Sequence, residues 1–154
     1  MLTRREAMKS LGIGSAAVAS AMLAGLAAAA ENAQSQAAPS TGRGVTVKKL
    51  FDYPLEDVKD ANAVVVRVDF APGAASAAHR HPGSVVGYVI SGTVEIQVAP
   101  GAIGSYQRGE LWYEPPHALH RVARNLSRTA PASILAFMIV PKGKPLVLPA
   151  SDTA

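Results

Sequence analysis

Short apolar runs rich in Val and Ile alternate with polar residues through most of the chain after residue 44. Gly, Pro, Asn and Asp separate these runs at the spacing of an all-β protein, and no long helical pattern follows residue 40. The pattern predicts seven strands: Val45–Leu50, Ala63–Phe70, Ser84–Ile90, Thr93–Val98, Leu111–Tyr113, His120–Ala123 and Ile134–Val140. Because many short antiparallel strands must hide their edges, we predict a single-domain barrel or jelly roll.

Glycine-containing pairs mark the turns between these strands. Ser91-Gly92 is a hairpin signal, because glycine tolerates the positive φ of a tight turn. Pro72-Gly73, Pro82-Gly83 and Arg108-Gly109 are placed where other strands should end.

The first thirty residues have the three parts of a secretion signal. Arg4, Arg5 and Lys9 precede an apolar run rich in Ala and Gly, and the paired arginines resemble a twin-arginine signal. That motif prefers a bulky aromatic residue where Ala7 stands, and small residues ending at Ala30 suit cleavage. The alternative is an uncleaved membrane anchor, since about twenty apolar residues approach the length of a span. The low hydrophobicity of Ala and Gly argues against an anchor.

We therefore divide the chain into four parts. Residues 1–30 are the signal peptide, and residues 31–43, which lack a hydrophobic period, are a flexible linker. Residues 44–147 are the barrel domain, and residues 148–154 are a C-terminal tail. The signal predicts export to the periplasm or secretion, without stable membrane association after cleavage.

Composition narrows the classes of partner and site. The chain has 154 residues, 49% of them apolar and 17% charged, which suits one globular domain. The net charge is +4, and the basic residues are dispersed with few aromatic residues between them, so nucleic-acid binding is not expected. Cysteine is absent, which excludes thiol chemistry, disulfides and cysteine-held clusters. A metal site would therefore use mainly nitrogen and oxygen ligands.

The four histidines occupy two short segments. On a strand, His79 and His81 share one face at a spacing of about 6.6 Å, so one ion could bridge them. We predict that these two residues and His120 bind one metal ion, the alternative being loop or supporting histidines. His117 lies in a Pro-Pro turn and is expected to be exposed rather than ligating, and Arg80 should point to the opposite face as a solvated or salt-bridging side chain.

Two motifs resemble those of the cupin superfamily, over about residues 60–140. The first, G-x5-H-x-H-x3-E-x6-G, is matched at every fixed position except the glutamate, where Val85 stands. The second, G-x5-P-x-G-x2-H-x3-N, is matched at three positions, while His117 replaces the glycine and Asn125 falls one residue late. The matching residues are Gly73, His79, His81 and Gly92 in the first motif, then Gly109, Pro115 and His120 in the second.

The resemblance implies a double-stranded β-helix with a divalent metal near one open end of the barrel, and a homodimer formed through sheet edges and terminal segments. Imidazoles with one carboxylate suit Fe, Mn, Ni or Zn. Without the glutamate, three histidines still make a viable site, although Val85 could equally indicate a weakened or lost one. Glu114 is a substitute ligand, with a solvated loop carboxylate as the alternative; Glu95 and Gln97 are weaker candidates, expected at the surface.

The few aromatic side chains have two interpretations. Trp112, Tyr88, Tyr113 and Phe137 could line a small-molecule pocket, but core packing is the stronger expectation in a domain with so few of them.

Three functions remain open at this point. The first is an exported metal-dependent enzyme that acts on a small organic molecule, of dioxygenase, isomerase or lyase type. The second is a non-catalytic module that binds a metal or a small ligand. The third is a degenerate barrel with a structural or partner-binding role. The sequence identifies no separate catalytic residue.

Overall fold

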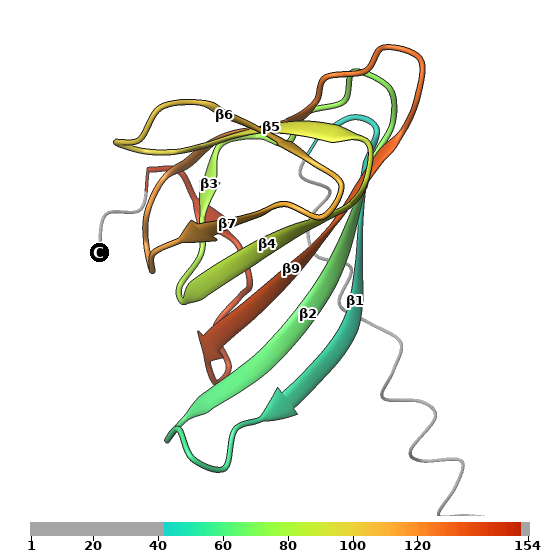
Figure 1. The fold of residues 1–154 in the computed structure, drawn as a ribbon. Helices are drawn as coiled ribbons and strands as arrows, with labels where there is room; N and C mark the ends of the chain where they lie inside the picture. Colours follow the sequence, from blue (N-terminus) through green and yellow to red (C-terminus); the bar gives the residue numbers. More distant parts are fainter. Residues whose placement is uncertain (1–41, 152–154) are drawn as a thin grey trace, which may run out of the picture. The chain divides into compact units, whose positions relative to one another are not determined.

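The computed structural model describes residues 42–151, which form ten strands and no helix (Figure 1). The strands are β1 (Val45–Pro54), β2 (Ala61–Phe70), β3 (His79–Arg80), β4 (Ser84–Ser91), β5 (Thr93–Val98), β6 (Gly104–Gln107), β7 (Leu111–Glu114), β8 (His120–Asn125), β9 (Ala132–Pro141) and β10 (Leu148–Pro149). All seven predicted strands are confirmed. The short strands β3, β6 and β10 were not predicted as separate elements.

The predicted signal peptide, its twin-arginine motif and most of the linker lie outside the described residues. Within the part of the chain that is described, no helix has the length and apolar character needed to cross a membrane. Residues 148–149, in the predicted tail, form the edge strand β10.

The strands form two five-stranded antiparallel sheets. One has the order β1-β2-β9-β4-β7 and the other the order β10-β3-β8-β5-β6. Figure 1 shows β1, β2, β9 and β4 side by side in one twisted layer, with β5 and β6 in the other. This arrangement confirms the predicted all-β, double-stranded β-helix barrel in a single domain.

The hairpin prediction at Ser91-Gly92 is wrong. Strands β4 and β5 lie in different sheets, so this turn carries the chain from one sheet to the other. Gly92 has a φ of 77°, and a Cβ there would lie 2.7 Å from that of Ala132 at the start of β9. Glycine is therefore needed at this position for a sharp corner that packs against β9. Such a corner between sheets and a hairpin turn both require a positive φ, which glycine adopts readily.

The core follows the alternation of side chains along the strands. In β9, Ile134, Ala136, Met138 and Val140 are buried, while the residues between them are more exposed. Phe70, at the end of β2, is 1% exposed and is among the largest fully buried side chains of the described residues. Inward-facing residues of both sheets thus fill most of the barrel.

The outer face of the β1-β2-β9-β4-β7 sheet carries a continuous apolar row. Register places Tyr113, Val86, Phe137, Val65 and Phe51 directly opposite one another on successive strands. Opposed residues of antiparallel strands share a face, and four of the five are exposed, by 39% to 55%. Core packing is therefore the wrong expectation for Tyr113 and Phe137. We name these five residues the outer row.

Candidate metal centre

The structure brings His79, His81 and His120 together at one end of the barrel. His79 lies on β3, where it is paired with Pro149 of β10 on one side and with His120 of β8 on the other. His81 follows β3 directly. One ring nitrogen from each of the three histidines lies within 4.8 Å of the others, and His81 and His120 are buried.

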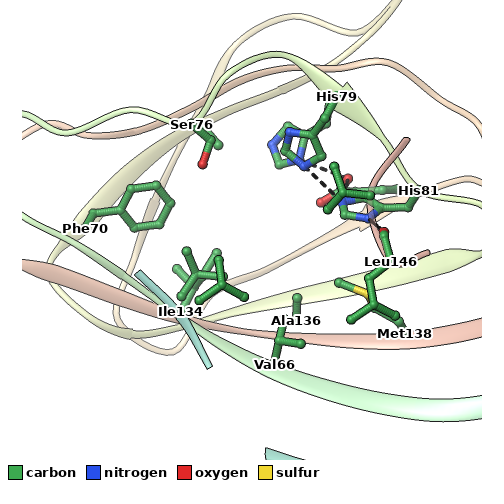
Figure 2. Close-up of a pocket in the computed structure, with 15 residues that line it drawn as sticks. Val66, Phe70, Ser76, His79, His81, Ile134, Ala136, Met138 and Leu146 are labelled. Carbon is green, nitrogen blue, oxygen red and sulfur yellow. Dashed lines mark hydrogen bonds and ion pairs between the residues drawn. The ribbon is translucent and has the colours of Figure 1, made fainter. Parts of the chain in front are cut away.

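Backbone carbonyls fix the rings of His79 and His81. Nδ1 of His79 lies 2.8 Å from the carbonyl oxygen of Ala77, and Nδ1 of His81 lies 2.6 Å from that of Leu146. Because a carbonyl only accepts, each Nδ1 must carry the proton, and each neutral ring then keeps its lone pair on Nε2. The two Nε2 atoms are 3.1 Å apart (Figure 2). Two lone pairs at this distance repel each other unless a cation or a proton lies between them.

The surroundings of the rings favour their neutral forms. Burial, with a smaller contribution from neighbouring His81, lowers the pKa of His79 to about 4. Burial also lowers the pKa of His81, although Glu114 and the Leu146 carbonyl act in the opposite direction. Neutral imidazole is the form that binds metal ions. At neutral pH these two rings are therefore ready to act as ligands, and a shared proton is disfavoured.

Glu114 is the fourth polar group of this cluster, and it is only 2% exposed. Its Oε1 accepts a hydrogen bond of 2.9 Å from Nε1 of Trp112. Its Oε2 lies 3.0 Å from Nδ1 of His120 and 3.7 Å from Nε2 of His81. The interpretation of Glu114 as a solvated loop carboxylate is wrong, because β7 extends through residue 114 and alternation turns this side chain inward with Trp112.

The charge of Glu114 is retained in spite of its burial. Burial by itself would raise the pKa of the carboxyl, but the close His120, the nearby His81 and the Trp112 hydrogen bond together hold that pKa below its usual value. The contact between Glu114 and His120 lacks hydrogen-bond geometry. Oε2 of Glu114 and both ring nitrogens of His120 are thus buried without a hydrogen-bond partner in the described residues.

The residues present fit a divalent metal ion. Three imidazole nitrogens and one carboxylate oxygen are a donor set that Fe(II), Mn(II), Ni(II) and Zn(II) accept. The separation of 3.1 Å between two Nε2 atoms is one that two ligands about 2.1 Å from a common ion can have. A cation would also satisfy the unpartnered Oε2 of Glu114 and one of the two unpartnered ring nitrogens of His120.

His117 is not part of this cluster, and its backbone instead links the two histidine segments. Its N–H donates to the carbonyl of His81, and its carbonyl accepts from Nη1 of Arg80. The φ of His117 is 60°, a left-handed conformation that explains why glycine suits this position in the motif. Arg80 also donates to the carbonyl of Ala150, so the expectation of a solvated or salt-bridging side chain is wrong.

The weaker carboxylate and amide candidates lie away from the histidines. Glu95 forms an ion pair with Arg124, and Gln97 donates to the carbonyl of Gly101. Both alternate along β5 with the buried Val94 and Ile96.

A cavity of about 60 Å³ adjoins the cluster. Figure 2 shows His79 and His81 at one end of it and Phe70 and Ser76 at the other, with Ile134 along one side. Its walls are otherwise mostly aliphatic side chains, and none of the four aromatic residues considered from the sequence lines it. The arrangement can hold an ion at the polar end and a small apolar group beside it.

Comparison with known proteins agrees with this architecture. Residues 66–139 match the family model described as a cupin domain, and this range contains the three clustered histidines and Glu114. No curated protein matches the chain.

Several solved structures have a similar fold. An RmlC-like cupin from Shewanella frigidimarina NCIMB 400 has 23% identity and a TM-score of 0.51, over 65% of this chain and 79% of that chain. KdgF from Halomonas sp. has 22% identity and a TM-score of 0.53, over 66% and 83%. The polyketide cyclase RemF from Streptomyces resistomycificus has 18% identity and a TM-score of 0.54, over 73% and 75%. The match to a cupin-domain model over residues 66–139 and these structures thus agree on a cupin-like fold for the β-barrel of this chain.

Proposed function

We propose that the protein is an exported, metal-dependent enzyme that acts on a small organic molecule. The observation that carries the proposal is the opposed pair of Nε2 atoms of His79 and His81, 3.1 Å apart, with both Nδ1 atoms committed to carbonyls. His79, His81 and His120 would hold the ion, which would supply Lewis-acid or redox chemistry according to whether it is Fe, Mn, Ni or Zn. Export is supported by the N-terminal sequence.

The cavity supports a small and largely apolar substrate. Its volume of about 60 Å³ suits only a few non-hydrogen atoms, and its lining contains no Lys, Arg, Asp or Tyr. Apart from the histidine and Glu114 end, Ser76 offers the one polar side chain of the described lining. Phe70, Ile134 and Ala136 would bind the apolar part and exclude water, so the polar group of the substrate would face the histidines.

A non-catalytic binding module is the second candidate. The observation that favours it is the scarcity of further acid, base or nucleophile in the cavity lining, where Ser76 alone stands apart from the metal cluster. Against it, RemF is named as a polyketide cyclase, so a barrel of this fold is compatible with catalysis. The fold itself does not decide between the two functions.

The proposal is tested with a double variant, His79→Ala with His81→Ala. We expect wild type to purify with metal and to convert at least one member of a panel of small oxidisable, isomerisable or hydrolysable compounds. The double variant should lose both the metal and the turnover. Metal without saturable turnover across the panel would favour the binding module, and equal metal in both proteins would contradict the site.

We also propose a homodimer in which the outer row packs against its counterpart in a second copy. The outer row contains no charged side chain, so an apolar surface is its matching partner. A second copy related by a twofold axis supplies the same apolar row. The five strands have 10, 10, 10, 8 and 4 residues, so at about 3.3 Å per residue and about 4.8 Å spacing this face covers about 670 Å². That area approaches the roughly 800 Å² that each partner of a standard interface buries.

Replacing Phe137, at the centre of the outer row, tests the dimer. We expect light scattering with size exclusion to give twice the mass of one chain for wild type and one chain mass for Phe137→Glu, because a buried unpaired carboxylate is costly. Ser105→Glu, at an exposed position on β6 in the other sheet, should leave the dimer intact. A monomeric wild type, or a dimeric Phe137→Glu, would contradict the interface.

A further inference from the structure

Position 85 and position 114 face the same part of the barrel from neighbouring strands. Val85 on β4 is 1% exposed and lies directly opposite Glu114 of β7 in the sheet register. Residues so opposed point to the same face, with Cβ atoms about 4.5–5.5 Å apart. The first histidine motif has Val85 in place of a carboxylate, and the carboxylate of Glu114 lies directly opposite on the neighbouring strand.

We propose that Glu114 supplies the carboxylate ligand of the metal from β7, in place of a residue at position 85 on β4. The proposal rests on the metal site proposed above. Oε2 of Glu114 is directed at His120 and His81, at 3.0 and 3.7 Å, and has no hydrogen-bond partner. In the described residues, Glu114 has ion-pair contacts with His120 and His81 and with no lysine or arginine, and both histidines are neutral when they bind a metal. A buried carboxylate needs such compensation, which a divalent cation provides.

Trp112 is the positioning residue for this ligand. Its indole N–H donates to Oε1 of Glu114, which leaves Oε2 as the free oxygen facing the histidines. Gly87 of β4 lies opposite Trp112 and leaves room for the indole, because a Cβ at position 87 would lie 2.1 Å from Cζ2 of the ring. Gly87, Trp112 and Glu114 therefore act together to orient one carboxylate oxygen.

The experiment moves the carboxylate between the two strands. The full chain, stripped with a chelator, is titrated with Zn(II) by calorimetry and with Co(II) by absorption spectroscopy, as wild type, as Glu114→Gln, and as Glu114→Gln combined with Val85→Glu. We expect Glu114→Gln to weaken zinc affinity by about 100-fold or more. Val85→Glu in the same chain should recover affinity to within about tenfold of wild type and restore the Co(II) spectrum, because the cross-strand position gives an equivalent reach.

Two further variants make the result decisive. Glutamine keeps an oxygen that accepts the hydrogen bond from Trp112, so Glu114→Gln should stay folded. The matched control is Glu56→Gln, a substitution at an exposed loop position, which should bind zinc as wild type does. Should Glu114→Gln fail to fold, Trp112→Phe retains the carboxylate while removing its anchor, and it should weaken zinc affinity by about tenfold. Wild-type affinity in Trp112→Phe would then overturn the proposal.

The outcomes separate this inference from the proposed function. If wild type and Glu114→Gln bind zinc equally well, Glu114 is not a ligand, and the three-histidine site is unaffected. Failure of Val85→Glu to recover affinity would overturn the equivalence of the two positions. A wild type that binds neither Zn(II) nor Co(II) would overturn the metal site as a whole.

Discussion

Removal of the metal ion is expected to lower the melting temperature of the loaded protein by about 15 °C. An ion that binds only the folded state stabilises it by about 4 kcal/mol when the free ion is at 1,000 times its dissociation constant. For a domain of this size, each kcal/mol corresponds to about 4 °C. The apoprotein also keeps the opposed Nε2 atoms of His79 and His81 and the unpartnered Oε2 of Glu114. Differential scanning calorimetry with and without a chelator measures the shift.

The double variant His79→Ala with His81→Ala is the control for this prediction. It lacks two of the three proposed histidine ligands, so added metal or chelator should move its melting temperature by no more than about 2 °C. The same melting temperature for wild type with metal and with chelator would mean that the histidines do not hold a stabilising ion.

Truncation of Phe70 is expected to destabilise the barrel by about 3–5 kcal/mol. Phe70 is 1% exposed and packs in the core cluster with Val89, Val94 and Ile134, so the alanine variant loses buried apolar surface and leaves a void. The void would join the existing cavity, which Phe70 lines. Urea unfolding monitored by circular dichroism gives the free energy of unfolding.

Phe51→Ala provides a matched control for Phe70→Ala. Phe51 is 50% exposed on β1, and its truncation should cost about 1 kcal/mol or less in the monomer. Because Phe51 belongs to the outer row, the two proteins should be compared in the monomeric Phe137→Glu background. Equal costs at the two positions would contradict the placement of Phe70 in the core.

The sequence predicts the long strands of this barrel and the four-residue β7, but not β3, β6 and β10. Alternation of Val and Ile with polar residues locates β2, β4 and β9, whose buried faces follow a period of two. Strands β3 and β10 have two residues each and no period to detect; they exist because each pairs with a distant segment. The turn at Gly92 differs from the predicted hairpin because a hairpin and a crossover between sheets both require a positive φ at this glycine.

Within the site, spacing and motif were enough to identify the histidines, but not to settle the carboxylate. The burial of Glu114 depends on the pairing of β7 with β4, which places it across from Val85. No local pattern in the sequence encodes that register. The same reason applies to Arg80, whose hydrogen-bond acceptors are carbonyls 37 and 70 residues away along the chain. Long-range pairing thus decides which polar residues join the histidines.

The most direct test of the account is the metal content of the protein purified from its native compartment. We predict that elemental analysis finds about one transition-metal ion per chain in wild type and almost none in the His79→Ala, His81→Ala variant prepared in the same way. Equal metal content in the two proteins, or none in either, would contradict the claim that these imidazoles converge on one ion.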